Sequence, residues 1–175
     1  MEGARLTMSF RSMAVAFAGR GFAVFPLAPK SKIPLIAGGR GCLDATKDVE
    51  QIEKWWGDAP SANIGIACGP ESGIFVIDVD TYKGASFDDL LSAAGMSETT
   101  EIVTRVVRTA RGGQHFYFKY PLGGIGCKND ILPGIDIKGA GGYVVSNDSF
   151  VVDEKTGLSG WYKLESDNPI QDCPC

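Results

Sequence analysis

The feature that most constrains this chain is an apolar run that ends in two carboxylates. The segment "IFVIDVD", residues 74–80, places four apolar residues before Asp78, Val79 and Asp80. In an extended strand, residues i and i+2 point to one face, so the two acids are expected to project together, roughly 6.6 Å apart along the backbone. If both are charged, they repel by about 2–3 kcal/mol at an effective dielectric constant of about 20.

Something must offset this repulsion. A divalent cation is the usual solution, because hard ions such as Mg²⁺ and Mn²⁺ prefer carboxylate oxygens. The alternative is a polar turn that simply follows a buried strand. The two acids alone do not decide between a metal site and a turn.

Chain length and charge restrict the classes of protein to which this sequence can belong. The chain has 175 residues and is 44% hydrophobic, enough for one core and a small second lobe. Its formal net charge is −4, but residues 1–47 carry a net +5 and the remaining residues a net −9. A polyanion can bind such a chain if metal ions neutralise the acidic part. Ordinary solvated surface charge is the alternative explanation of the same asymmetry.

Cysteine and histidine usage argues against a structural zinc site. The chain has five cysteines and one histidine, without CxxC spacing, whereas structural zinc sites need four well-spaced Cys or His ligands. Free thiols are therefore expected. No run approaches the roughly 18 apolar residues of a membrane span, so we expect no membrane partner and a cytoplasmic location.

Hydrophobic periodicity predicts alternating helices and strands first and mostly strands later. For the second helix, Asp44 or Thr46 is the expected N-cap and Val49, Ile52 and Trp56 the expected inward face. This order indicates an α+β or mixed α/β fold. Helices are expected within residues 10–21, 47–60 and 85–96, and strands within residues 22–29, 62–69, 73–80, 102–110, 114–121, 134–139 and 141–146, followed by a hairpin within 149–164.

Three strand segments carry polar groups that can converge. Beside Asp78 and Asp80, the segment "RGGQHFYF" places His115, Tyr117 and Lys119 on one face, and "PGIDIKGAGGYVV" places Asp136 and Lys138 on one face. Three carboxylates can hold two divalent ions about 3.5–4 Å apart, an arrangement suited to phosphoryl transfer. His115, Lys138 and Arg111 would donate to a triphosphate. The glycines at 112–113 and 139–142 would let the backbone approach a ligand closely, or would form a simple bulge or turn.

The ordered series of segments resembles the bifunctional primase–polymerase (prim-pol) N-terminal domain of the archaeo-eukaryotic primase superfamily. The resemblance covers most of the chain and rests on "AVAFAGRGFAVFPLAPKSKIPL", "DATKDVEQIEKWW", "ANIGIACGPESGIFVIDVD", "TARGGQHFYF" and "PGIDIKGAGGYVVS". One position departs from it: the residue two before the histidine, often serine in the superfamily, is Gly113, where a backbone amide is expected to replace the hydroxyl. The zinc-binding stem of some relatives has no matching Cys–His set here.

The resemblance implies a role for each matched residue. Asp78, Asp80 and Asp136 match the metal-binding and catalytic acids, and His115 matches the catalytic histidine that contacts the triphosphate. The expected nucleotide-binding residues are His115, Lys138, Arg111, Lys32 and Lys30, the last two with nucleotide or template roles.

The resemblance also implies an architecture and a reaction. It predicts a small α/β module joined to an RRM-like module, with the active site in the cleft between them. Residues 1–175 would be a single catalytic domain of two tightly packed modules, excised from a longer replication protein. The reaction would be DNA priming and polymerisation with two Mg²⁺ or Mn²⁺ ions and dNTP or NTP substrates.

The implied partners are a single-stranded DNA template, a primer and a helicase or accessory region, in the cytoplasm of a prokaryotic or phage-infected cell. Aromatic residues are candidate surfaces for base stacking. These are Trp55, Trp56, Tyr82 and Tyr143, although burial in the core is the commoner use of Trp at helical spacing.

Two rival functions remain. The first is a non-catalytic nucleic-acid-binding module of a replication initiator that retains the fold; intact acids and the histidine argue against it. The second is another metal-dependent nucleotide enzyme, such as a DxD glycosyltransferase, against which the third acid in "GIDIKG" argues. A P-loop NTPase is excluded because the chain has no GxxxxGK[ST] segment.

Overall fold

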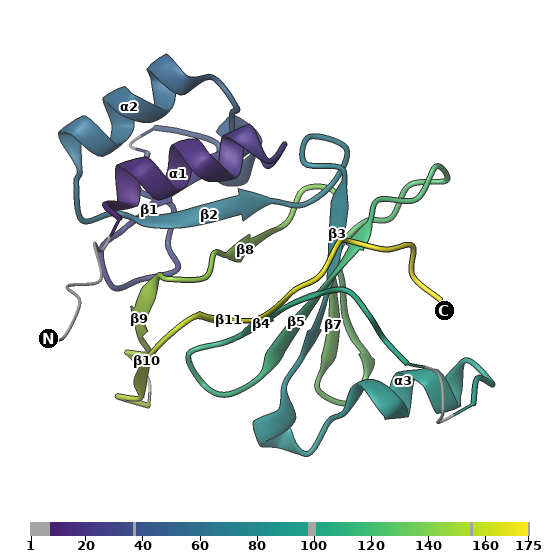
Figure 1. Ribbon diagram of the computed structural model, residues 1–175. Coiled ribbons are helices and arrows are strands. Elements are labelled where there is room, and N and C mark those ends of the chain that lie inside the picture. Colours follow the sequence, from purple (N-terminus) through teal and green to yellow (C-terminus); the bar gives the residue numbers. More distant parts are fainter. Residues whose placement is uncertain (1–7, 37, 98–100, 155, 175) are drawn as a thin grey trace, which may run out of the picture.

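The computed structural model describes residues 8–36, 38–97, 101–154 and 156–174. Its described part is a mixed α/β fold with antiparallel sheets, as the sequence predicts (Figure 1). The helical elements are α1 (Phe10–Gly19), η1 (Gly41–Asp44), α2 (Val49–Asp58), η2 (Thr81–Lys83) and α3 (Phe87–Ala93). The strands are β1 (Val24–Leu27), β2 (Asn63–Ala67), β3 (Ile74–Val79), β4 (Arg105–Arg108), β5 (Gln114–Lys119), β6 (Lys128–Leu132), β7 (Ile135–Lys138), β8 (Tyr143–Val145), β9 (Phe150–Val152), β10 (Ser159–Trp161) and β11 (Lys163–Asp167).

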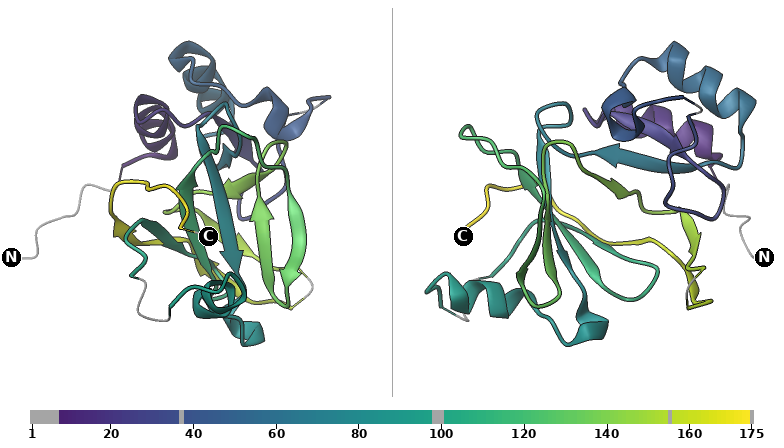
Figure 2. Two further views of the ribbon diagram at one scale, coloured as in Figure 1. Left: turned by 90° about the vertical axis from the view of Figure 1, so that its right-hand side faces the viewer. Right: turned by 180° about the vertical axis from the view of Figure 1, so that it is seen from behind.

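The first module combines α1 and α2 with a three-stranded sheet of order β1-β2-β8. Figures 1 and 2 show the two helices lying together on one side of this sheet. Apolar residues on both layers, among them Phe17, Ile52 and Ile64, are buried in one cluster. Strand β8 comes from much later in the chain, after β3 to β7 of the second sheet, so the first module is discontinuous in sequence.

The second module is built on a six-stranded sheet of order β11-β4-β5-β3-β7-β6. Its central strands take the order β4-β5-β3-β7, with α3 following β3, which is the strand order of the expected RRM-like sheet. A β-α-β-β-α-β unit would place a second helix between β5 and β7, but in this chain strand β6 occupies that connection. Strands β6 and β11 were not predicted as separate elements.

The two faces of the six-stranded sheet belong to different cores. On one face Val76, Val107 and Tyr117 join the apolar cluster of the first module. On the other face Phe75, Ile77 and Phe116 pack in a second cluster with Phe87 and Leu91 of α3. Burial of apolar area on both faces stabilises the central strands strongly, and it makes the module boundary a packed interior.

The start of α2 differs from its prediction. The N-cap is Asp48, whose side chain accepts from the Glu50 backbone N–H, while Asp44 bonds to Arg40 and Thr46 accepts from the Asp48 backbone N–H. Ile52 and Trp56 face the core as expected, but Val49 is 44% exposed. It is the first residue of the helix, where the chain still lies outside the core. None of the described helices is long and apolar enough to cross a membrane.

Replacing the N-cap should test the start of α2. The Asp48→Ala variant is expected to lose about 1 kcal/mol of unfolding free energy, because a backbone N–H of the first turn loses its acceptor. Urea denaturation measures the loss, with Lys54→Ala on the exposed face of the same helix as the control, for which a change within about 0.5 kcal/mol is expected. Equal stability of the Asp48→Ala variant and the wild type would contradict the assignment.

Candidate active site

A row of three polar residues crosses the middle of the six-stranded sheet. Strand β3 lies between β5 and β7, and its register pairs Asp78 with His115 on one side and with Asp136 on the other. Directly opposed residues on neighbouring strands share a face. These three side chains therefore lie on the face of the sheet that packs against the first module. Val76 and Tyr117 lie on the same face.

Asp78 is largely buried and is held by the histidine. The Nε2 atom of His115 lies 3.4 Å from Oδ1 of Asp78. Burial acts to raise the pKa of Asp78, but the charge and hydrogen bond of His115, with the charges of Lys138 and Lys32, lower the pKa below its ordinary value. Asp78 is consequently a carboxylate at neutral pH. The other ring nitrogen of His115, Nδ1, is buried and has no hydrogen-bond partner in the described part of the chain.

The second acid of the row, Asp136, is paired with a lysine of its own strand. The Nζ atom of Lys138 lies 2.7 Å from Oδ2 of Asp136, and the backbone N–H of Asp130 donates to Oδ1 at 2.9 Å. Burial acts to lower the pKa of Lys138, but the hydrogen bond and charge of Asp136 raise the pKa above its ordinary value. Lys138 thus stays charged at neutral pH.

Asp80 is the residue that directly follows the strand. Strand β3 ends at Val79, and Asp80 begins η2, with its carboxylate Oδ2 lying 2.6 Å from Nζ of Lys83. Strand β3 thus ends one residue earlier than expected, and the expectation that Asp78 and Asp80 project together stays a prediction. In the described part of the chain, no three His, Cys, Asp or Glu side chains lie close enough to hold a metal ion. The metal site on Asp78, Asp80 and Asp136 stays a prediction.

A pocket of about 390 Å³ opens over Asp78 and His115 of the row, whereas Asp136 and Asp80 are not among its lining residues. Asp78, His115 and Lys138 line it from the six-stranded sheet, while Lys32, Tyr143 and Val144 line it from the first module. The pocket hence lies between the two sheets and presents one carboxylate beside three groups that can donate to an anion.

Residues 14–175 match the family model Prim-Pol, described as the bifunctional DNA primase/polymerase, N-terminal. The chain belongs to the Prim-Pol family. Membership implies primase/polymerase nucleotidyltransferase activity. A search of curated proteins finds no match for the chain.

The basic residues expected to bind nucleotide in this Prim-Pol domain separate into two groups. Lys138 and Lys32 line the pocket. Lys30 and Arg111 are not among its lining residues: Lys30 is exposed, and Arg111 lies over the Tyr82 ring, 4.2 Å from its centroid. Arg111 also lies 3.5 Å from Asp153. Their expected nucleotide roles have no support from their positions.

The aromatic candidates for base stacking separate in the same way. Trp56 is 1% exposed and its indole N–H donates to the Ala62 carbonyl, so the proposed stacking role is wrong for this residue. Trp55 packs against the core of the first module. Tyr82 is exposed beneath Arg111, and Tyr143 lines the pocket, where its hydroxyl donates to the Lys32 carbonyl at 2.8 Å.

Tyr162 is a pocket residue that sequence reasoning missed. Its ring centroid lies 5.7 Å from that of His115, and the side chain is 3% exposed at the edge of the pocket. Burial raises the pKa of its hydroxyl strongly, so the phenol is neutral at physiological pH. The segment "GWYKL" carries no acid, histidine or glycine pattern that marks it, because the contact arises only from the path of the chain after β10.

The close packing at two glycine segments is against the protein's own backbone. A Cβ atom at Gly113 would lie 2.7 Å from the Val79 carbonyl oxygen, which explains why the serine of the wider superfamily is not accommodated here. A Cβ atom at Gly139 would lie 2.3 Å from the Ile125 carbonyl oxygen. The expectation that the Gly113 amide replaces a serine hydroxyl stays a prediction.

Adding a side chain at Gly113 should test this packing. The Gly113→Ala variant is expected to lose about 1–3 kcal/mol of unfolding free energy, because β3 and the turn before β5 must move apart. Chemical denaturation measures the loss. The Gly123→Ala variant is the matched control, since a Cβ atom there meets no heavy atom within 4 Å. Similar stabilities of the two variants would contradict the steric explanation.

The lowered pKa of Asp78 predicts a pH dependence of stability. Since the pKa of Asp78 is lower in the folded than in the unfolded chain, the unfolded chain takes up the proton first as the pH falls. The stabilisation by the ionised side chain is complete above about pH 5 and is lost below the ordinary aspartate value of about 3.9. Unfolding free energies of wild type and Asp78→Asn, measured between about pH 7 and pH 3, should therefore converge at acid pH. A constant difference over this range would contradict the lowered pKa.

Proposed function

We propose that this chain is the catalytic domain of a DNA primase/polymerase that carries out template-directed nucleotidyl transfer in the pocket between its two sheets. The observation that carries the proposal is the row His115–Asp78–Asp136 on the pocket side of the central strands, in a chain of the Prim-Pol family. This pocket is our candidate for the expected cleft between the modules.

The basic groups of the pocket would bind the triphosphate of the incoming nucleotide. Lys32 approaches from the first module and Lys138 from β7, so an anion between them would gain two charge-assisted contacts. His115 is 5% exposed, and its imidazole is held in place by Asp78 and by the ring of Tyr162. A fixed donor loses little conformational entropy on binding, which favours precise positioning of the phosphates.

Asp78, which lines the pocket, and the neighbouring Asp136 and Asp80 suit a divalent cation in their chemistry, since carboxylate oxygens are the ligands that Mg²⁺ and Mn²⁺ prefer. Asp78 and Asp136 would hold it from opposed positions on neighbouring strands, and Asp80 would join them on leaving Lys83. When bound, a pair of such ions lowers the pKa of the attacking hydroxyl and neutralises the charge that develops on the phosphates.

The proposed reaction joins a primer, or an initiating nucleotide, to the next nucleotide. The 3′-hydroxyl attacks the α-phosphate, its proton leaves to solvent, and pyrophosphate departs with the electron pair of the broken P–O bond. A single-stranded DNA template selects the nucleotide. The proposed context is replication of a plasmid, phage or other mobile element, with a helicase or accessory region elsewhere in a longer protein.

Primer extension tests the proposal directly. A primed single-stranded DNA template is incubated with dNTPs and either Mg²⁺ or Mn²⁺, and the product is resolved on a gel. Wild type should extend the primer, and Asp78→Ala/Asp80→Ala should lose extension by about 10³-fold or more, because the developing negative charge is no longer neutralised. Asp58→Ala/Asp88→Ala, which removes two exposed acids from α2 and α3, is the charge-matched control.

Two results would contradict the proposal. One is wild-type extension rates in the Asp78→Ala/Asp80→Ala variant. The other is a folded wild type that binds the template and extends nothing with either ion, which would favour the non-catalytic binding module of a replication initiator. Circular dichroism of each variant separates loss of chemistry from loss of fold.

A further inference from the structure

A second pocket, of about 450 Å³, lies on the far side of the module boundary from the proposed active site. It is lined by Arg20 and Phe22 after α1, by Arg105 of β4 and Lys119 of β5, and by Asp167 of β11. We call it the basic pocket. Ile74 at the start of β3 also lines it, roughly 13 Å along the strand from Asp78.

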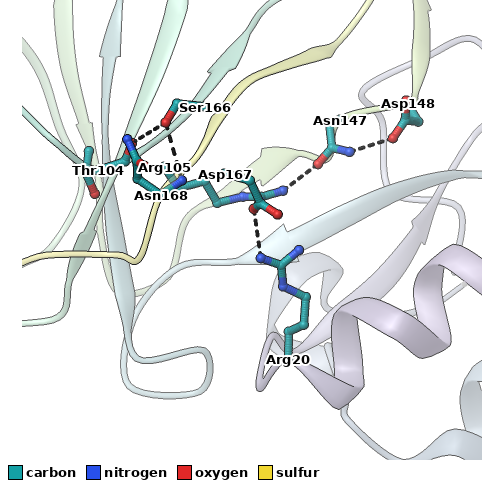
Figure 3. A network of polar contacts seen from close by, with 8 residues as sticks. All are labelled: Arg20, Thr104, Arg105, Asn147, Asp148, Ser166, Asp167 and Asn168. Carbon is teal, nitrogen blue, oxygen red and sulfur yellow. Dashed lines mark hydrogen bonds and ion pairs between the residues drawn. The ribbon is translucent and has the colours of Figure 1, made fainter.

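Arg105 is the buried wall of the basic pocket. Its side chain is 1% exposed, forms an ion pair with Asp167, and donates from Nη2 to Oδ1 of Asn147 at 2.7 Å (Figure 3). The guanidinium carbon lies 5.7 Å from the centroid of the Tyr117 ring. The Nε atom is buried and has no hydrogen-bond partner in the part of the chain that the structure describes. A buried donor without an acceptor is costly.

The charges around Arg105 do not balance. Arg20 contacts the same Oδ1 atom of Asp167 at 2.8 Å, so one carboxylate serves two guanidinium groups (Figure 3). Lys119 pairs with Asp172 at 3.3 Å, but both side chains are more than half exposed and solvent screens the pair. The lining therefore contains three cations and one carboxylate. This excess contrasts with the net charge of −4 of the whole chain.

We propose that the basic pocket binds phosphate groups of a single strand of DNA. Guanidinium groups match phosphate oxygens in shape and stay charged when desolvated. An anion here would balance the second guanidinium that Asp167 leaves uncompensated. The ring in the lining, Phe22, is 4% exposed and offers no face to a base, so the pocket fits backbone phosphates better than a free nucleotide.

The location suits a strand that also reaches the active site. Val76 and Tyr117 are buried between the two pockets, so a single nucleotide does not span them. A strand of several nucleotides passing around the module boundary does, since single-strand binding sites cover about 4–16 nucleotides. The basic pocket would then bind the strand away from the proposed active site, and the incoming nucleotide would be selected in the active-site pocket.

The test measures strand binding without metal or nucleotide, so that it is independent of polymerase activity. A labelled oligothymidylate of about 16 nucleotides is titrated by fluorescence anisotropy over a range of NaCl concentrations. The test variant is Arg20→Gln/Lys119→Gln, which leaves the buried Arg105–Asp167 pair intact. The charge-matched control is Arg11→Gln/Lys54→Gln on the exposed faces of α1 and α2.

The expected result is a change in the salt dependence. Each lost phosphate contact lowers the slope of log K against log salt by about 0.7 for a single strand, so the test variant should lose about 1.4 and the control much less. An unchanged slope, an equal loss in the control, or a wild type that binds no strand would each overturn the proposal. A further contrary result concerns pyrophosphate. If pyrophosphate stabilises the wild type against heat, and Arg20→Gln/Lys119→Gln abolishes this stabilisation without affecting strand binding, the ligand is a free phosphate compound and the proposal is overturned.

Discussion

Strand β3 is the element on which the rest of the structure depends. Its alternate residues enter two different cores: Val76 packs with the first module, and Ile77 packs with α3. Burial on both faces leaves the strand no freedom to slip, because a shift by one residue would move every side chain to the wrong face. The same register places His115 and Asp136 on either side of Asp78.

The local sequence pattern was sufficient for the elements that follow simple periodicity. Alternation in "QHFYFK" and "GIDIK" predicts correctly which residues of β5 and β7 share the face of Asp78, because strand periodicity is set by the backbone itself. The RRM-like sheet came from the family resemblance and agrees with the strand order. Lys32 reaches the pocket as expected, although nothing in its loop sequence fixes where that loop lies.

The features that sequence reasoning missed all depend on contacts between distant segments. Strand β11 exists because it pairs with β4, far earlier in the chain, and its residues carry no apolar run. Tyr162 reaches His115 only through the route of the chain past β10. In each case the deciding partner lies outside the window that periodicity covers.

Each of the three acids has a hydrogen-bonding or charged partner within the chain itself. Asp78 is held by His115, Asp80 by Lys83 and Asp136 by Lys138, so every predicted metal ligand has an internal partner. The partners differ in exposure: the Lys83 side chain is 53% exposed, whereas that of Lys138 is 25% exposed. Solvent screens the exposed pair and makes it the weaker one. Under the proposed function, Asp80 is consequently the acid that an entering cation would draw in most easily, while Lys138 would stay beside Asp136 to meet the phosphates.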